Sequence, residues 1–261
     1  MPQIALLSQE TIDKIAAGEV IERPSSVVKE LVENAIDAGS SAVTVEIKEG
    51  GISFIRISDN GCGIEREQIP LAFLRHSTSK IKSVEDLFTV TSLGFRGEAL
   101  SSIAAVSQVE LITKTNGDFT GSRYLIEGSK EVSLEEIGAP DGTTFIVRNL
   151  FYNTPVRLKF LKKPATEAAK VAEMIARLIL AHPDVSFRLI HNGKQIYASS
   201  GNGDLRSAVF SLYGREIAGA MIAVKSEGAV AVSGLVGVGL QARSNRARQT
   251  FIVNGRTIRS S

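Results

Sequence analysis

The chain has 261 residues, and 43% of them are hydrophobic, which is enough apolar material for a large core and for two domains. A single cysteine, Cys62, excludes an internal disulfide, and three scattered histidines exclude a Cys/His zinc cluster. No apolar run approaches the roughly 18 residues that span a bilayer, and no signal-like leader precedes the first expected helix. We therefore expect a cytoplasmic protein with no secretion signal and no membrane partner.

Basic and acidic residues are unevenly divided along the chain, whose formal net charge is +2. From Arg206 onward there are eight basic and two acidic residues, a net charge of +6. The rest of the chain holds 22 basic and 26 acidic residues, a net charge of −4. A basic segment beside an acidic body is typical of a surface that meets a polyanion, although a well-solvated surface fits the charges equally well.

Hydrophobic periodicity predicts helices and strands up to residue 204. A helix over 8–17 begins near Ser8, and a second helix begins at Pro24 and ends at Gly39. Alternating residues predict strands, which form hairpins through 49–51 and about Asn192-Gly193. The expected strands are 43–48, 52–57, 109–113, 124–127, 143–147, 185–191 and 195–198. Further helices are expected over 98–105 and 165–180.

Small polar residues at 199–204 predict a domain boundary. We expect one domain over 1–204 and a second over 205–261. The second should hold a helix over 205–212 and strands over 221–225, 229–238 and 250–253. Helices and hairpins intermix without a regular strand–helix alternation, so the sequence predicts an α+β fold with a mixed sheet.

Four polar residues lie on one face of the helix that begins at Pro24. Glu30, Glu33, Asn34 and Asp37 follow the i, i+3, i+4, i+7 spacing of a single helical face. In most helices such a pattern is a solvated stripe opposite the core. The functional interpretation makes Glu30 a general base that orients water toward a γ-phosphate. Asn34 would then supply an oxygen ligand to Mg²⁺.

A glycine-containing loop over 59–64 follows the second expected strand. An Asp-Asn-Gly turn is a common way for a strand to end. In the functional interpretation, Asp59 accepts a hydrogen bond from the amino group of adenine. Gly61 and Gly63 would let the backbone approach the base.

A glycine-flanked turn over 94–100 runs into the helix expected over 98–105. Gly94 and Gly97 fit an ordinary entry to a helix, and they equally fit a lid hinge whose backbone N–H groups favour phosphate. The turn is not a P-loop, because the Gly-Lys-Ser/Thr ending is absent. Upstream, Thr78, Ser79 and Lys80 supply the hydroxyls and the cation that a phosphate-covering segment needs.

Together, in this order, the three stretches resemble the N-terminal ATPase region of the MutL family of DNA mismatch-repair proteins. That family shares a superfamily with gyrase B subunits, ninety-kilodalton heat-shock chaperones and histidine kinases. The MutL branch is indicated by the sequences at 15–21, 94–100, 149–155 and 251–256, which cover nearly the whole chain.

The resemblance implies a Bergerat-type α/β sandwich with a mixed sheet, followed by the start of a ribosomal-protein-like βαβ domain. It implies an ATP site in which Glu30 is the base and Asn34 binds Mg²⁺. The other nucleotide-binding residues that it implies are Asp37, Asp59, Gly61, Gly63, Thr78, Ser79, Lys80, Gly94, Arg96, Gly97, Glu98, Ala99, Leu100 and Thr143. Residues 96–100 would belong to a lid, and Thr143 would support the adenine contact. The family's phosphate-sensing lysine would lie beyond Ser261.

The resemblance further implies an ATP-driven molecular switch in DNA mismatch repair. ATP would drive association of two copies, and the closed homodimer would signal to a MutS-like mismatch-recognition protein, a nicking enzyme and a helicase. The basic second domain should also bind duplex or single-stranded DNA without sequence preference. The candidate residues for phosphate contacts are Arg243, Arg246, Arg248 and Arg256.

Two alternatives to this function remain. The first is a gyrase-type topoisomerase ATPase, which the lid sequence at 94–100 disfavours, because gyrases carry a Gly/His-rich loop there. The second is a DNA-binding scaffold that does not hydrolyse ATP. It is disfavoured because Glu30, Asn34 and Asp59 are all intact.

Overall fold

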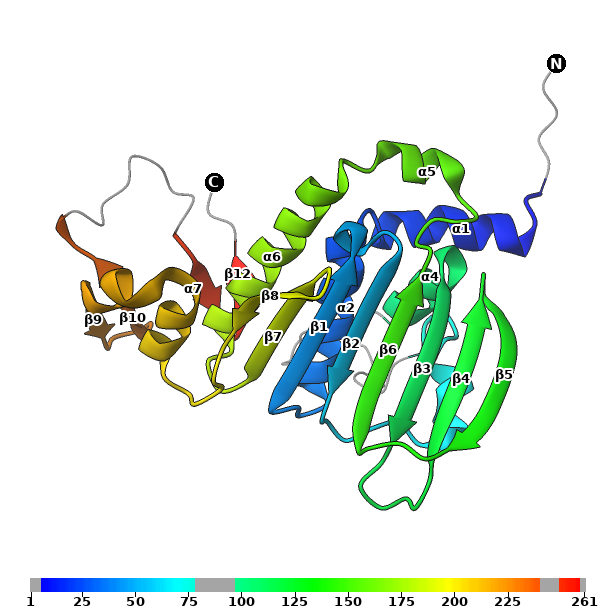
Figure 1. The fold of residues 1–261 in the computed structure, drawn as a ribbon, viewed down its shortest axis with the longest axis horizontal. Coiled ribbons are helices and arrows are strands. Elements are labelled where there is room, and N and C mark those ends of the chain that lie inside the picture. The colour runs from blue at the N-terminus through cyan, green and yellow to red at the C-terminus, as the bar shows by residue number, and fades with distance from the viewer. Residues whose placement is uncertain (1–5, 78–96, 240–248, 259–261) are drawn as a thin grey trace.

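The computed structural model of the chain describes residues 6–77, 97–239 and 249–258 (Figure 1). Two short 3₁₀ helices lie at Glu49–Gly51 and Arg66–Gln68. The α-helices are α1 (Gln9–Val20), α2 (Pro24–Asp37), α3 (Ile69–Ala72), α4 (Ala99–Val106), α5 (Pro155–Phe160), α6 (Pro164–Ala181) and α7 (Leu205–Gly219). The strands are β1 (Ala42–Lys48), β2 (Phe54–Asp59), β3 (Gln108–Lys114), β4 (Gly121–Glu127), β5 (Lys130–Ile137), β6 (Gly142–Arg148), β7 (Ser186–His191), β8 (Lys194–Ala198), β9 (Met221–Ser226), β10 (Val232–Gly237), β11 (Phe251–Val253) and β12 (Arg256–Ile258).

Eight of the strands form one sheet, in the order β5-β4-β3-β6-β2-β1-β7-β8. β1 and β7 run parallel, with Val45 opposite Leu189, and every other neighbouring pair in this sheet is antiparallel. The sheet is therefore mixed, and its combination with helices confirms the predicted α+β class.

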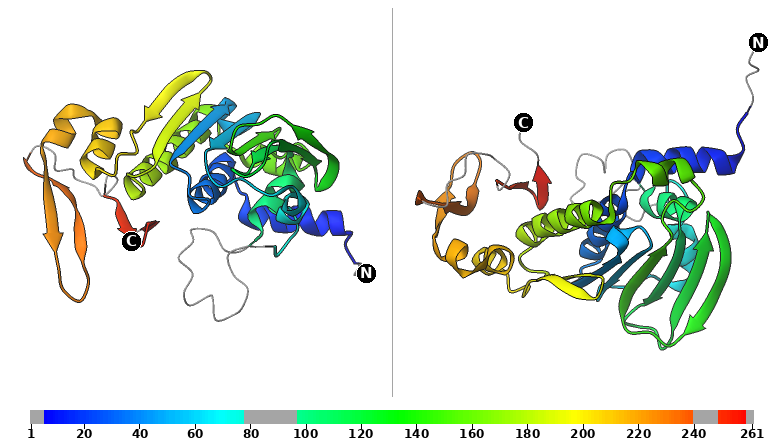
Figure 2. Two further views of the ribbon diagram at one scale, coloured as in Figure 1. Left: turned by 90° about the horizontal axis from the view of Figure 1, so that it is seen from below. Right: turned by 45° about the horizontal axis from the view of Figure 1, so that its top comes forward.

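The helices cover one face of the sheet and enclose the core (Figures 1 and 2). α2 and α4 pack directly on central strands, α6 packs on β7 and α2, and α1 packs on α4. Alternate residues of β1 point to this face, and Val45 and Ile47 are fully buried. They belong to the same core cluster as apolar residues of α2 such as Leu31. Each such side chain contributes about 1.5–3 kcal/mol when it is fully buried.

The end of α2 sets the direction of the chain into β1. Gly39 adopts φ +75°, a left-handed conformation that glycine enters without a steric penalty. Its N–H donates to the carbonyl of Ile36 at 2.9 Å, and the N–H of Ser40 donates to the carbonyl of Ala35 at 3.2 Å. This pair of bonds is a Schellman motif, which ends the helix and satisfies two of its last carbonyls. The helix end predicted at Gly39 is thereby confirmed.

Most expected elements are present, with bounds that differ by a few residues. The strand expected over 52–57 is instead Phe54–Asp59, because the turn at Glu49–Gly51 needs the positive φ values of Gly50 and Gly51 and takes up the start of that segment. Asp59 is consequently the last residue of β2. The prediction missed α3, α5, β5 and β12.

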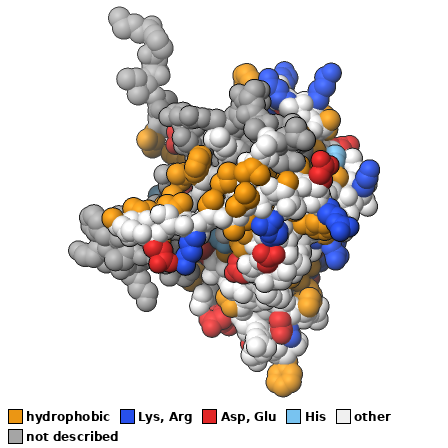
Figure 3. Space-filling view, turned by 90° about the vertical axis from the view of Figure 1, so that its left-hand side faces the viewer, with side chains coloured by type: hydrophobic (Ala, Val, Ile, Leu, Met, Phe, Trp, Pro, Cys, Tyr) orange, Lys and Arg blue, Asp and Glu red, His pale blue; other side chains and the backbone are white. Residues whose placement is uncertain are grey.

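The C-terminal part of the described chain consists of α7 and two antiparallel hairpins, β9–β10 and β11–β12. α7 is capped by Asp204, whose carboxylate accepts from the backbone N–H groups of Arg206 and Ser207. The βαβ order expected for this part stays a prediction. Figure 3, which views this end of the molecule, shows apolar side chains at the surface beside basic ones. The exposed apolar residues of the β9–β10 hairpin include Ile222, Val224, Val230, Val232 and Val236. Within the described ranges, no helix is long and apolar enough to cross a membrane.

Candidate functional site

The polar face of α2 is only partly exposed to solvent. Glu30, Asn34 and Asp37 are half-buried, and Glu33 is only 9% exposed. The opposite face of the same helix supplies the core, so α2 is held between the sheet and its neighbouring helices while these polar groups line its other side. The polar face of α2 is therefore partly buried, and its role in binding a nucleotide stays a prediction.

One lysine connects two of these carboxylates. The Nζ atom of Lys29 lies 3.1 Å from Oε1 of Glu30 and 2.8 Å from Oε2 of Glu33. Burial lowers the pKa of Lys29, but its hydrogen bond to Glu33 and the charge of Glu30 outweigh burial and raise that pKa above its ordinary value. Burial raises the pKa of Glu33, and the hydrogen bond from Lys29 opposes the increase. Sequence reasoning missed Lys29, because it lies outside the i, i+3, i+4 pattern.

The carboxylate of Asp59 lies where β2 ends and is surrounded by neutral donors. Its Oδ1 atom accepts from the hydroxyl of Ser40 at 3.1 Å and from the N–H of Gly61 at 2.8 Å. The backbone N–H of Thr143, directly opposite Asp59 in the β2–β6 register, also donates to the carboxylate. Burial raises the pKa of Asp59, and the three hydrogen bonds act in the opposite direction.

Two buried threonines support the strand ends beside Asp59. The hydroxyls of Thr113 and Thr143 lie 3.1 Å apart and are hydrogen-bonded, and the residues are 1% and 7% exposed. The Thr113 hydroxyl also accepts from the N–H of Ile64 at 2.9 Å. β3, β6 and the loop that follows β2 are therefore linked through one hydroxyl pair. Thr143 lies beside Asp59 as the sequence indicated, whereas Thr113 was missed, since a threonine in a strand carries no distinctive signal.

The two glycines of the loop after β2 are required by contacts within the protein. A Cβ atom at Gly61 would lie 2.7 Å from the Ser40 hydroxyl oxygen. Gly63 has φ +73°, and its Cβ would lie 2.3 Å from the carbonyl oxygen of Lys114. Both approaches are closer than a carbon atom tolerates. The sequence interpretation assigned these glycines to a ligand, but the packing of the chain already demands them.

The structure describes only part of the expected phosphate-binding region. Gly97 has φ +61°, and its Cβ would lie 2.6 Å from the carbonyl oxygen of Ser77, so these two residues are immediate neighbours. Glu98 is the N-cap residue of α4, whose first residues, Ala99 and Leu100, are half-buried. The other residues predicted for this region lie outside the described residues: Thr78, Ser79, Lys80, Gly94 and Arg96.

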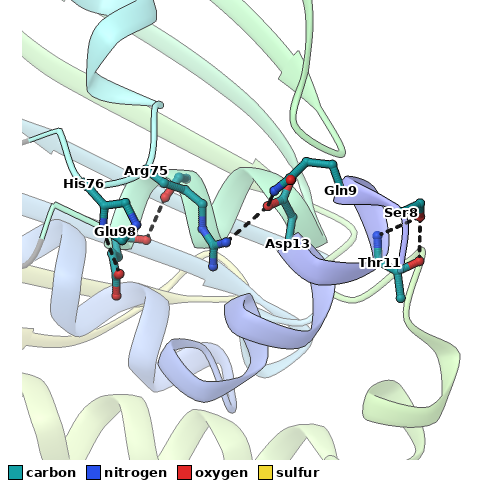
Figure 4. A network of polar contacts seen from close by, with 8 residues as sticks. Ser8, Gln9, Thr11, Asp13, Arg75, His76 and Glu98 are labelled. Atoms are coloured by element: carbon teal, nitrogen blue, oxygen red, sulfur yellow. Dashed lines mark hydrogen bonds and ion pairs between the residues drawn. The ribbon is translucent and has the colours of Figure 1, made fainter. Parts of the chain in front are cut away.

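A chain of polar contacts links this region to α1 (Figure 4). Nδ1 of His76 lies 3.3 Å from Oε1 of Glu98, and the neighbouring Arg75 donates to Oδ1 of Asp13 at 3.3 Å. Gln9 donates to the same Asp13 oxygen at 3.0 Å. The first helix is thus bonded to the segment that precedes residue 78.

The predicted DNA-contact residues are described only in part. Arg256 lies on β12 and is exposed, while Arg243, Arg246 and Arg248 lie outside the described residues. Among the side chains that the structure describes, no group of three or more His, Cys, Asp or Glu residues is arranged to hold a metal ion.

Three features define the candidate site: a polar face on α2, a carboxylate fixed at the end of β2, and a glycine turn that enters α4. A family model described as "Histidine kinase-, DNA gyrase B-, and HSP90-like ATPase" matches residues 19–152, which contain all three. The chain belongs to this family of ATPases.

Within that family, the chain is a homologue of the DNA mismatch repair protein MutL. It is 62% identical over 262 residues to MutL of Agathobacter rectalis, covering 100% of this chain and 40% of that protein. It is 48% identical over 261 residues to MutL of Caldanaerobacter subterraneus subsp. tengcongensis, covering 100% of this chain and 44% of that protein. The chain therefore spans less than half the length of these curated relatives.

Solved structures agree with this assignment. The Aquifex aeolicus MutL ATPase domain complexed with ADP superposes with a TM-score of 0.72 at 30% identity, covering 92% of this chain and 85% of that one. The N-terminal domain of a DNA repair protein superposes with a TM-score of 0.80 at 26% identity, covering 95% and 78%. The resemblance drawn from the motifs is confirmed.

Proposed function

We propose that this chain binds ATP with Mg²⁺ and hydrolyses it, as the nucleotide switch of a mismatch-repair protein. The observation that carries the proposal is the Asp59 carboxylate, fixed by Ser40, Gly61 and Thr143. An ionised carboxylate has about four lone-pair sites. Two donors among the described residues occupy Oδ1, so the other carboxylate oxygen, Oδ2, suits an N–H of the adenine amino group.

Glu30 is the proposed general base. It would accept a proton from the water that attacks the γ-phosphate, and Lys29 would hold its carboxylate in position before that water arrives. The half-buried setting of Glu30 on α2 supports this role, because a base must be fixed and yet remain within reach of water.

Asn34 is the proposed protein ligand of Mg²⁺. It lies one turn beyond Glu30 on the same face of α2, and its amide oxygen is a hard donor of the kind that this ion takes. Among the described residues, no group of three or more His, Cys, Asp or Glu side chains is arranged to hold a metal, which fits an ion held mainly by phosphate oxygens and water. When bound, Mg²⁺ would neutralise charge that develops on the phosphates.

The phosphates themselves are assigned to two segments. Gly97, Glu98, Ala99 and Leu100 would offer backbone N–H groups at the start of α4. The sequence-based candidates Thr78, Ser79, Lys80, Gly94 and Arg96 would cover the other side, and Asp37 would complete the polar face of α2. The ADP bound to the Aquifex aeolicus MutL ATPase domain supports a nucleotide in a fold of this kind.

The switch would act on partners beyond this chain. ATP binding would order the lid and α1, two copies would associate, and the dimer would signal to a MutS-like protein, a nicking enzyme and a helicase. We propose that 205–261 begins a second domain whose basic residues, including Arg256, contact DNA phosphates. The 62% identity to a MutL protein supports this pathway over a topoisomerase.

Two measurements test the core of the proposal. Titration calorimetry with ATP and with GTP, each with Mg²⁺, should give binding for ATP only, and Asp59→Asn should abolish it. Phosphate release, measured with and without duplex DNA, separates an ATPase from a scaffold that only binds nucleotide. Equal affinity for ATP and GTP, or wild-type affinity in Asp59→Asn, would refute the adenine assignment.

A further inference from the structure

A buried serine between α2 and β1 contacts the carboxylate of Asp59. Ser40 is only 4% exposed, and its hydroxyl donates to Oδ1 of Asp59 at 3.1 Å. That oxygen also accepts from the N–H of Gly61 at 2.8 Å. Oδ1 therefore carries two donors, which is about the number that one carboxylate oxygen accepts.

The backbone fixes the position of the Ser40 hydroxyl from the side of α2. The N–H of Ser40 closes the Schellman motif on the carbonyl of Ala35 at 3.2 Å. Two residues earlier, the carbonyl of Ala38 accepts from the N–H of Cys62 at 3.1 Å, which joins the helix end to the loop after β2. The backbone of Ser40 is thus held between two anchored segments, and the hydrogen bond to Oδ1 of Asp59 sets the direction of its hydroxyl.

The loop after β2 fixes the hydroxyl from the other side. A Cβ at Gly61 would lie 2.7 Å from the Ser40 oxygen, so the absence of a side chain there makes room for the hydroxyl. The next serine, Ser41, makes a different bond: its hydroxyl accepts from the Asn60 side chain at 2.8 Å. Two adjacent serines therefore have separate partners, and Ser40 is the one directed at the carboxylate.

We propose that Ser40 is a positioning residue for nucleotide recognition, whose hydroxyl occupies Oδ1 of Asp59 and so holds the other oxygen of that carboxylate in place for the adenine amino group. The proposal rests on the proposed function, since it gives Ser40 a role in the same adenine contact. Ser40 touches Asp59 rather than the base, so it acts through the carboxylate.

Electrostatics support this role. The donors to Asp59 among the described residues are all neutral, so the carboxylate has no cation to stabilise its charge there. The charged groups on neighbouring elements are occupied with one another, since Lys114 pairs with Asp141 at 2.7 Å and Lys29 pairs with Glu30 and Glu33. Asp37 also lies on α2. Because a donated hydrogen bond favours the ionised form, loss of the Ser40 hydroxyl should raise the pKa of Asp59 further above its ordinary value.

The experiment compares the whole chain with Ser40→Ala and Ser40→Cys, where the second keeps the side-chain shape but replaces the hydroxyl with a larger thiol that is a weak donor. Ser41→Ala is the matched control, because it removes the adjacent hydroxyl without touching Asp59. The first readout is the pKa of the Asp59 carboxyl, which is measured without nucleotide by NMR of the ¹³C-labelled group. The second is ATP affinity by calorimetry between pH 5 and pH 8, with the thermal midpoint as a check on folding.

We expect both Ser40 variants to titrate Asp59 at higher pH than the wild type, and to bind ATP roughly tenfold more weakly at neutral pH. As the pH is lowered, both Ser40 variants should begin to lose ATP affinity at a higher pH than the wild type does. Ser41→Ala should follow the wild type. An unchanged Asp59 titration in both variants would overturn the proposal, as would a loss of affinity equal at every pH. If the wild type fails to bind ATP while the Asp59 titration still moves, the proposed function fails and the Ser40–Asp59 coupling stands.

Discussion

The ammonium nitrogen of Lys29 lies 3.1 Å from Oε1 of Glu30, the carboxylate that we assign as the base. The same nitrogen pairs with Glu33 one turn further along α2. The side chain of Glu30 is 27% exposed and that of Glu33 is 11% exposed. Both carboxylates pair with the same cation, but they differ in solvent exposure. Glu30 is the more exposed of the two, so a water molecule reaches it more readily.

Glu30→Ala should leave ATP binding nearly intact and slow hydrolysis by roughly a hundredfold or more, the loss expected when a positioned base is removed. Glu33→Gln is the matched control, because it removes the other partner of Lys29 and should keep most of the hydrolysis. Phosphate release under single-turnover conditions measures both variants. A normal rate in Glu30→Ala would remove Glu30 from the role of base.

The raised pKa of Asp59 predicts opposite pH effects on binding and on folding. Adenine recognition needs the carboxylate, so ATP affinity should be full above this raised pKa and should fall as the pH decreases through it. The folded state holds the Asp59 proton more tightly than the unfolded state does. The stability that this carboxyl contributes is therefore present below its ordinary value of 3.8 and is lost as the pH rises through the raised value.

Calorimetry of ATP binding and denaturation of the nucleotide-free chain test these two effects across that pH window. Asp59→Asn cannot ionise, so this variant should lack the contribution of the group to the stability profile, and it should not bind ATP at any pH in the window. An ATP affinity that stays constant as the pH falls through the window would show that the ionised carboxylate is not what the nucleotide needs.

The sequence predicted the parts of the fold and site that local patterns encode. Pro24 and Gly39 bound α2, the four polar residues of that helix share a face, and the β1–β2 hairpin forms at Gly50 and Gly51. Each of these features depends on helical or strand periodicity, or on a glycine in a turn.

Other features depend on contacts between distant segments, and the sequence did not predict them. β5 is an edge strand with exposed charged residues, so it lacks the apolar alternation that identifies a half-buried strand. Ser40 meets Asp59 nineteen positions away, and Thr113 meets Thr143 thirty positions away. Only the assembled sheet brings these side chains together.

Gly63, in the loop after β2, should not tolerate substitution, because it lies against the backbone of Lys114. Gly63→Ala would place a Cβ at φ +73° and 2.3 Å from a backbone oxygen, which cannot move without disturbing β3. We expect a loss of about 3 kcal/mol in the free energy of unfolding. Gly117→Ala is the control, because a Cβ there meets nothing within 4 Å, and its effect should stay within about 0.5 kcal/mol. Urea denaturation measures both, and equal stabilities would contradict the packing argument.

The chain should bind DNA weakly and without sequence preference, through phosphate contacts of the basic residues from Arg206 onward. Those residues give that part a net charge of +6. The triple variant Arg243/Arg246/Arg248→Glu should weaken binding to all duplex sequences alike while ATP binding is kept. Affinity of the wild type should fall with salt at a slope near −0.9 per phosphate contacted, and the slope of the triple variant should be shallower.

Charge reversal on a second basic surface is the matched control for this prediction. Three lysines at and after α5, Lys159, Lys162 and Lys163, are also basic. Reversing all three to Glu changes the net charge of the chain by the same amount as the first triple variant. We expect fluorescence anisotropy with labelled duplexes, recorded from low to physiological salt, to give near wild-type affinity for this second variant. If the second variant loses binding and the first keeps it, the DNA surface lies on these lysines near α5.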